Sequence, residues 1–211
     1  MAERIPAITV LAGANGAGKS SIIGEFIRQH GGTYYNPDEA ARKLRAKYPK
    51  LEPQEANSLA WTLGKEGLEA AIAARLDYVI ETTLGGNTIP ALLGKAARQG
   101  FRITLWYIGL CSVEEHIRRV KARVQRGGHN IPEARILERY VRSLENLVAL
   151  TPHLYELKLF DNSETVNIAA NERPKLRTLL YLKDGRIIEL ADLHSMPEWA
   201  RPVIVAARRI T

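Results

Sequence analysis

The chain has 211 residues, of which 45% are hydrophobic and 25% charged, and this length and composition suit one folded domain and exclude wholesale disorder. Its single cysteine, Cys111, excludes a disulfide framework and a four-cysteine zinc site and favours a reducing, cytoplasmic compartment. The formal net charge of +7 indicates an anionic partner, and composition alone leaves open a nucleic acid, a membrane surface or a phosphorylated small molecule.

Short apolar runs alternate with amphipathic segments along the chain, which is typical of an α/β fold with a mostly parallel central sheet flanked by helices. No apolar run approaches the ~18 residues of a membrane helix, and the first residues do not form a signal peptide. Strands are predicted over residues 8–11, 33–35, 78–80, 101–108 and 157–160, with a β-hairpin over 178–182 and 186–190. Helices are predicted over residues 19–29, 37–48, 55–75, 88–99, 112–126 and 132–150.

Residues 13–20 read GANGAGKS and match the pattern G-x-x-x-x-G-K-[ST] of a phosphate-binding loop (P-loop), between a predicted strand and a predicted helix. Backbone N–H groups of such a loop converge on phosphate oxygens, while Lys19 reaches the β- and γ-phosphates and the Ser20 hydroxyl binds Mg²⁺. The sequence therefore predicts binding of ATP or GTP together with Mg²⁺. The residues expected at the nucleotide are Gly13, Ala14, Asn15, Gly16, Ala17, Gly18, Lys19, Ser20 and Ser21.

A small kinase fits this motif better than a motor or transporter ATPase. Such ATPases usually carry a second strand of four apolar residues that ends in aspartate, whereas the nearest segment here, 78–81 (YVIE), ends in glutamate. A kinase places a carboxylate near the acceptor hydroxyl to take its proton, at the carboxyl end of a strand. Asp38 is the candidate for this role, with capping of the following helix as its alternative role and Glu39 as the rival carboxylate.

Polar side chains beside Asp38 and after the strand predicted at 78–80 are candidates for binding the acceptor. Their carboxylate, amide and hydroxyl groups suit a polyhydroxylated molecule, or Mg²⁺ held through water. The alternative is a plain strand-end turn that leads to two glycines. The candidates are Asn36, Glu81, Thr82 and Thr83.

Basic residues gather around a segment that is broken by glycine. Residues 112–143 contribute +4 to the net charge of +7. Within this stretch Arg126 and Arg139 flank residues 127–132 (GGHNIP), which is the pattern expected of a lid, over about residues 124–140, that closes on the transferred phosphoryl group. Many of the other charges there suit a solvated helix face.

Together these residues resemble the zeta-toxin family of P-loop kinases, most specifically over residues 126–146 (RGGHNIPEARILERYVRSLEN). The resemblance implies a P-loop kinase fold and ATP- and Mg²⁺-dependent phosphorylation of a hydroxyl, in characterised members on a UDP-activated amino sugar. It also implies a small helical antitoxin as a partner that obstructs the nucleotide site. The positions that match the family pattern are Lys19 and Ser20 for phosphate and Mg²⁺, Asp38 for the catalytic base, Glu81 and Thr83 for the acceptor, and Arg126 (or Arg123) and Arg139 for the phosphates.

We expect residues 1–170 to form the kinase domain and residues 171–211 a hairpin and tail packed on it. Two other functions stay open. A polynucleotide kinase or RNA-binding NTPase is favoured by the positive charge, but the sequence has no basic stripe interleaved with aromatic residues. A non-catalytic nucleotide switch needs neither Asp38 nor the arginine pair. A small-molecule acceptor therefore ranks above nucleic acid as the partner, and no membrane is expected.

Overall fold

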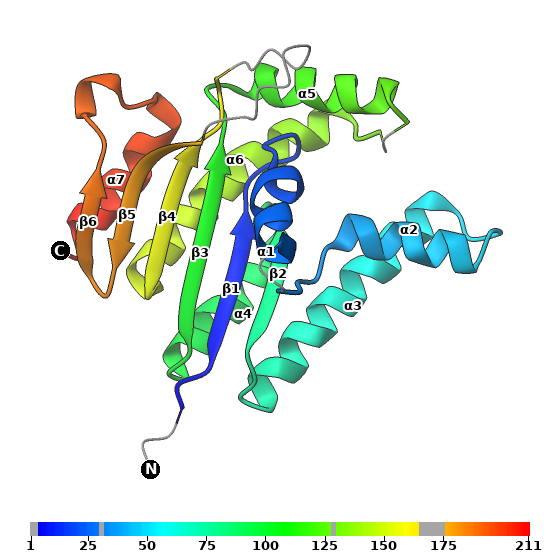
Figure 1. Ribbon diagram of the computed structural model, residues 1–211, viewed down its shortest axis with the longest axis horizontal. Helices are drawn as coiled ribbons and strands as arrows, with labels where there is room; N and C mark the ends of the chain where they lie inside the picture. The colour runs from blue at the N-terminus through cyan, green and yellow to red at the C-terminus, as the bar shows by residue number, and fades with distance from the viewer. Residues whose placement is uncertain (1–3, 30–31, 128–129, 165–175) are drawn as a thin grey trace.

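Figure 1 shows the computed structural model, which describes residues 4–29, 32–127, 130–164 and 176–211. Its strands form one sheet in the order β2-β1-β3-β4-β5-β6. The first four strands of this order run parallel, and β5 and β6 join them antiparallel. The strands are β1 (Ala7–Ala12), β2 (Tyr78–Thr82), β3 (Arg102–Gly109), β4 (Glu156–Asp161), β5 (Arg177–Lys183) and β6 (Arg186–Leu190).

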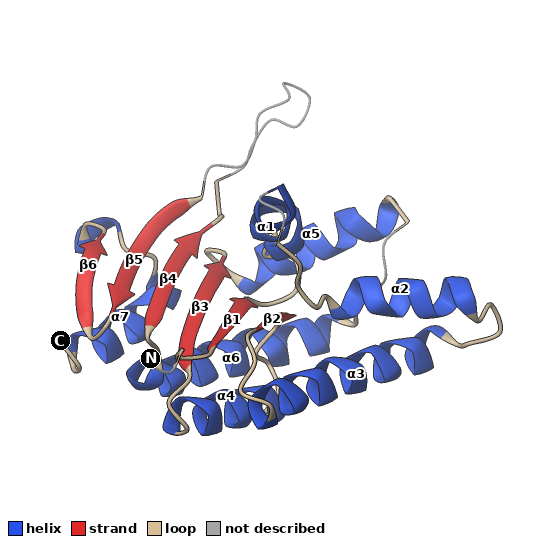
Figure 2. Cartoon of the chain, turned by 60° about the horizontal axis from the view of Figure 1, so that its bottom comes forward, coloured by secondary structure: helices blue, strands red, loops and turns tan. Residues whose placement is uncertain are grey.

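Helices cover the sheet on both sides, so the predicted α/β fold with a mostly parallel sheet and a C-terminal hairpin is confirmed. In Figure 2, α4, α6 and α7 run along one face and α1 lies on the other. The helices are α1 (Glu25–Gln29), α2 (Pro37–Lys47), α3 (Pro53–Ala73), α4 (Thr88–Arg98), α5 (Val113–Gln125), α6 (Glu133–Leu150) and α7 (Arg201–Arg208). Shorter helical turns span Ser20–Gly24, Thr151–His153, Leu193–Ser195 and Glu198–Ala200.

The strand predicted over residues 33–35 is reduced to one bridge. Only Tyr35 pairs with β2, where its N–H donates to the carbonyl of Val79 and its own carbonyl accepts from Glu81, both at 2.8 Å. Because α2 begins at Pro37, the chain leaves the sheet after a single paired residue. The bridge nevertheless brings the start of α2 next to the end of β2.

Local chemistry accounts for the ends of several elements. The Ser112 side chain accepts from the N–H of Glu115 and caps α5, as the sequence predicts. Asp184 and Gly185 have φ of +50° and +69°, and this two-residue turn joins β5 to β6 at the place predicted for the hairpin. The tail, for which the sequence predicts no element, forms α7.

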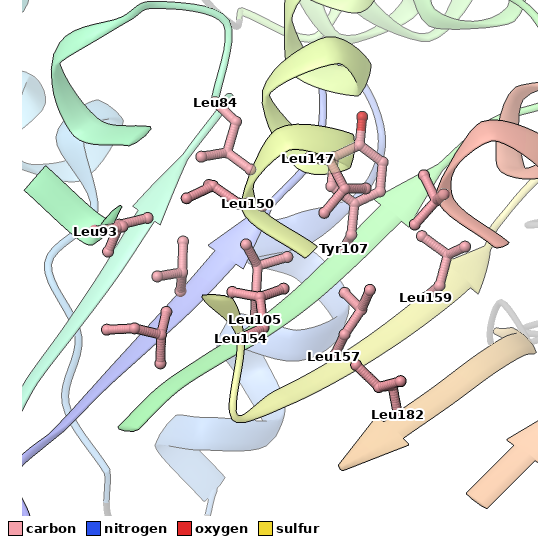
Figure 3. Close-up of a cluster of buried hydrophobic side chains, with 14 of the residues drawn as sticks. Leu84, Leu93, Leu105, Tyr107, Leu147, Leu150, Leu154, Leu157, Leu159 and Leu182 are labelled. Atoms are coloured by element: carbon pink, nitrogen blue, oxygen red, sulfur yellow. The ribbon is translucent and has the colours of Figure 1, made fainter. Parts of the chain in front are cut away.

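The main core lies between the sheet and the helices α4, α6 and α7. Figure 3 shows Leu105 and Tyr107 of β3 among leucines from α6 and β4. The tail completes this core, because the Trp199 ring lies 5.9 Å from the ring of Tyr107 and directly against Gly109. The division at residues 170 and 171 stays a prediction, since these residues lie outside those described.

Replacing Gly109 with alanine is expected to destabilise the fold. The added Cβ would lie 2.5 Å from the buried Trp199 ring, and overpacking of this kind costs about 1–3 kcal/mol. At about 2–4 °C per kcal/mol, the melting temperature falls accordingly. Gly94→Ala is the matched control, because a Cβ there meets only Arg98 at 3.5 Å inside α4, and it should raise stability by about 0.5–1 kcal/mol. Thermal unfolding measures both, and equal melting temperatures would contradict this account of the tail.

Among the described residues, none of the helices combines the length and the apolar character needed to cross a membrane.

Candidate active site

The phosphate-binding segment leaves the carboxyl end of β1 as a tight loop. Gly13, Gly16 and Gly18 have φ of +140°, +85° and +95°, a region that favours glycine. A Cβ on Gly13 would lie 2.2 Å from the carbonyl oxygen of Ile108 on β3, so the loop can turn here only without a side chain. The helical turn that precedes α1 begins at Ser20. The segment therefore has the strand, loop and helix context that its motif requires.

The Lys19 side chain curls back over this loop. Its Nζ donates to the carbonyl oxygen of Gly13 at 2.8 Å and to that of Ala14 at 3.4 Å, and the side chain is only 8% exposed. Burial lowers the pKa of the Lys19 ammonium, and the carboxylates of Glu81 and Asp38 oppose that shift. A cation is thus held over the loop at the position where the motif binds phosphate.

Glu81, near the end of β2, is buried beside the loop and is the centre of a polar cluster. The Ser20 hydroxyl donates to its carboxylate, with oxygen–oxygen distances of 2.8 and 2.9 Å. Asn36 donates its amide N–H to the same carboxylate at 3.0 Å, and the Nζ of Lys19 lies 4.0 Å away. A carboxylate next to a hydroxyl suits Mg²⁺, which binds protein through one or two such groups and keeps substrate phosphates and waters as its other ligands. The residues present therefore fit the metal that the motif implies.

Replacing Glu81 with glutamine is expected to stabilise the protein at neutral pH. Burial raises the pKa of Glu81, although Lys19 opposes the shift, so folding favours the protonated carboxyl and the charged form costs stability. This penalty is absent well below the ordinary pKa of 4.5 and grows as the pH rises through the raised value. We expect the melting temperature of Glu81→Gln to exceed that of the unaltered chain at pH 7, and the difference to shrink as the pH falls below 4.5. Equal melting temperatures at pH 7 would contradict the burial of a charged carboxylate.

Asp38 and Glu39 lie next to each other in the first turn of α2 but face different groups. The Asn36 side chain caps this helix by accepting from the N–H of Glu39, so capping does not require Asp38. The Asp38 side chain is 64% exposed, with its Oδ2 3.8 Å from a guanidinium nitrogen of Arg123 on α5. Glu39 instead forms an ion pair with Arg28 of α1. Of the two carboxylates, Asp38 is thus the more exposed one.

The two predicted lid arginines occupy different surroundings. On α6, Arg139 donates to the side-chain oxygen of Asn15 in the phosphate loop at 3.0 Å. Arg126 is the exposed residue that ends α5, and within the described part of the chain its side chain makes no polar contact with the loop. Arg123, the alternative to Arg126, is the one beside Asp38. A role for Arg126 at the phosphates stays a prediction, and residues 128–129 of the glycine-broken segment lie outside the described residues.

Thr82 and Thr83 shape the turn after β2. Their hydroxyl oxygens accept from the N–H groups of Leu84 and Gly85 at 3.1 and 3.3 Å, and both threonines are half-exposed. The Asn146 amide on α6 donates to the carbonyl of Leu84 at 2.7 Å and fastens this turn to the helix. The hydroxyls therefore have a structural task, and their proposed contact with an acceptor stays a prediction.

Two buried polar residues at the loop were missed by the sequence analysis. His116 of α5 approaches the carbonyl oxygen of Asn15 at 2.8 Å, and Asn162, just after β4, donates its amide N–H to the carbonyl of Ala17 at 2.9 Å. For His116 a signal existed, because it lies on the apolar side of α5, where a polar residue needs a partner. For Asn162 the only signal was its place after a strand.

The chain is similar in sequence to known proteins. A family model described as zeta toxin matches residues 1–173. A protein of Haemophilus influenzae described as uncharacterized is 34% identical over 128 residues, which cover 61% of this chain and 88% of that protein.

Solved structures share the fold at low sequence identity. The AvrRxo1-ORF1:-ORF2 complex superimposes with a TM-score of 0.67 at 13% identity, over 98% of this chain and 76% of that one. The structure of the same complex with ATP has a TM-score of 0.65 at 14% identity and covers 98% of this chain and 77% of that one. A structure of the PezAT chromosomal toxin–antitoxin system of Streptococcus pneumoniae has a TM-score of 0.55 at 15% identity and covers 99% of this chain and 87% of that one. The predicted P-loop kinase type of fold is confirmed by these likenesses.

Proposed function

Since the chain belongs to the zeta toxin family, we propose that it is an ATP- and Mg²⁺-dependent kinase that phosphorylates a hydroxyl of a small molecule. The observation that carries the proposal is the cluster of Lys19, Ser20 and Glu81 at the carboxyl ends of β1 and β2, with Asp38 exposed beside it. Open α/β sheets bind their ligands at this edge.

In the proposed reaction the acceptor hydroxyl oxygen attacks the γ-phosphorus of ATP. The bond from that phosphorus to the β–γ bridging oxygen breaks, ADP leaves with its electron pair, and the hydroxyl proton passes to the Asp38 carboxylate. Lys19 and Arg139 meet the negative charge on the transferred group. Ser20 and Glu81 would hold Mg²⁺, and the ion, when bound, would supply positive charge against the phosphates of ATP.

The acceptor is proposed to be a polyhydroxylated molecule, with a UDP-activated sugar as the first compound to test. The candidate contacts lie directly after the bridge at Tyr35 and at the end of β2, and they are Asn36, Glu81, Thr82 and Thr83. Turnover of ATP should be slow alone and faster with the right acceptor. A panel of nucleotide sugars and other polyols, with mass spectrometry of the products, tests this. Turnover that no hydroxyl compound accelerates, with no phosphorylated product, would contradict the proposal.

A helical antitoxin that covers the nucleotide site is the proposed protein partner, and the cytoplasm is the proposed location. Support comes from the family match and from PezAT, which is described as a toxin–antitoxin system. The test is to express the chain together with any short helical protein encoded beside it. We expect the two to purify as a complex and ATP binding to be lost in that complex.

A nucleic-acid enzyme is the second candidate, because the fold assembles a surface that the sequence does not reveal. Trp106, Lys158 and Tyr181 are neighbours in register across β3, β4 and β5. The Nζ of Lys158 lies 5.5 Å from the centre of the Trp106 ring and 4.8 Å from that of Tyr181. Aromatic rings beside cations can stack with bases of a single strand. A salt titration with a labelled oligonucleotide discriminates, since tight binding with a steep salt dependence that Trp106→Ala weakens would favour this candidate.

A further inference from the structure

Asn15 connects the phosphate loop to both α5 and α6. It is 9% exposed, and its two oxygens have different partners. The side-chain oxygen Oδ1 accepts from Nη1 of Arg139 at 3.0 Å, and the backbone carbonyl oxygen faces Nδ1 of His116 at 2.8 Å. Because the contacts use separate atoms, a side-chain substitution removes the first and leaves the acceptor of the second in place.

The contact with His116 fixes the backbone of Asn15. His116 is 1% exposed, and burial lowers its pKa to about 4, so the ring is neutral at neutral pH. A carbonyl oxygen only accepts, and Nδ1 is therefore the protonated nitrogen that donates. Next to it, a Cβ on Gly16 would lie 2.8 Å from the His116 carbonyl oxygen and 3.3 Å from a methyl group of Val120. With α5 packed this closely, the carbonyl of Asn15 has little room to move.

Arg139 reaches the phosphate loop from α6. A Cβ on Gly85 would lie 2.8 Å from Cγ and 3.0 Å from Cα of Arg139, so α6 packs directly on the turn after β2. The guanidinium is partly buried and remains charged at every physiological pH. The packing of α6 thus fixes the position of the Arg139 Cα, and the hydrogen bond to the amide oxygen of Asn15 fixes the position of its guanidinium.

We propose that Asn15 is a positioning residue that holds the Arg139 guanidinium over the phosphate loop, ready for the terminal phosphate of ATP. The inference rests on the proposed function, in which Arg139 meets the γ-phosphate. A neutral amide oxygen orients the guanidinium but competes only weakly with the γ-phosphate for it. A carboxylate at this position would instead hold Arg139 in a charged pair. Both removal of the amide and its replacement by a carboxylate should therefore weaken recognition of the γ-phosphate.

The test measures the dissociation constants of ATP and ADP, and their ratio reports recognition of the γ-phosphate without any acceptor. Asn15→Ala is expected to reduce the preference for ATP over ADP by about tenfold, which corresponds to one charge-assisted hydrogen bond. Arg139→Ala should reduce it at least as much. In the Arg139→Ala background, Asn15→Ala should change the ratio no further, because the two residues act through one contact. Asn15→Asp should also lower the ratio, although it retains a contact with Arg139.

Asn162→Ala is the matched control, since this buried asparagine holds the same loop through the carbonyl of Ala17 and, within the described residues, its side chain does not bond to Arg139. Its effect on the ratio should be the same with and without Arg139. An unchanged ratio in Asn15→Ala, or a loss that adds fully to that of Arg139→Ala, overturns the inference. If Asn15→Ala does not fold, Asn15→Asp, which keeps the shape of the side chain, decides the question, and an unchanged ratio there overturns the inference equally. Failure of the unaltered chain to bind either nucleotide overturns the proposed function instead, so the two failures are distinguishable.

Discussion

Asp38→Asn is expected to reduce phosphoryl transfer by about 10²- to 10⁴-fold, the range that general-base catalysis contributes. Asparagine keeps the shape of the side chain but cannot take the proton of the acceptor hydroxyl. Because Asn36 caps α2 and the Asp38 side chain is 64% exposed, the substitution should leave the fold and the affinity for ATP nearly unchanged. Single-turnover transfer to the best acceptor, together with ATP binding, measures both effects.

Glu39→Gln is the matched control for this experiment. It removes a carboxylate from the same turn of α2, but one that pairs with Arg28 rather than facing Arg123. We expect it to transfer phosphate at close to the normal rate. Full activity in Asp38→Asn, or an equal loss in both variants, would refute the assignment of Asp38 as the base.

Lys19→Met is expected to lower kcat/KM for ATP by about 10²- to 10³-fold, the loss measured when one preorganised donor to developing charge is removed. Lys19 is the buried cation whose Nζ donates to the carbonyls of Gly13 and Ala14 in the loop. Burial lowers the pKa of its ammonium, which means that the charged form costs stability. The melting temperature of Lys19→Met should therefore be equal to or above that of the unaltered chain, while kcat/KM for ATP falls.

Lys43→Met, on the exposed side of α2, controls for the loss of one positive charge and should leave both properties unchanged. If ATP affinity and turnover survive in Lys19→Met, the segment is a glycine-rich turn and not a nucleotide site. A large fall in melting temperature would show instead that the buried ammonium stabilises the fold, which is the opposite of what its lowered pKa predicts.

Elements with local causes could be predicted from the sequence. The phosphate loop follows from glycines at positive φ, the start of α5 from the cap at Ser112, and the C-terminal hairpin from the turn at Asp184 and Gly185. The strand at residues 33–35 was overpredicted, because its β-branched and aromatic residues suit a strand but only Tyr35 pairs with β2 before the predicted helix begins at Pro37. The last helix, α7, was missed because Pro202 and the preceding turns hide its short apolar pattern.

The sequence by itself determined the class of this protein, since the loop motif is eight contiguous residues and the order of strands and helices follows from hydrophobic periodicity. Only the tertiary structure decided which side chains meet. Asn15 and Arg139 are 124 positions apart, and Ser20 and Glu81 are 61 apart. Such pairs depend on the order of strands in the sheet and on how closely helices pack at Gly16 and Gly85, and no local pattern encodes either.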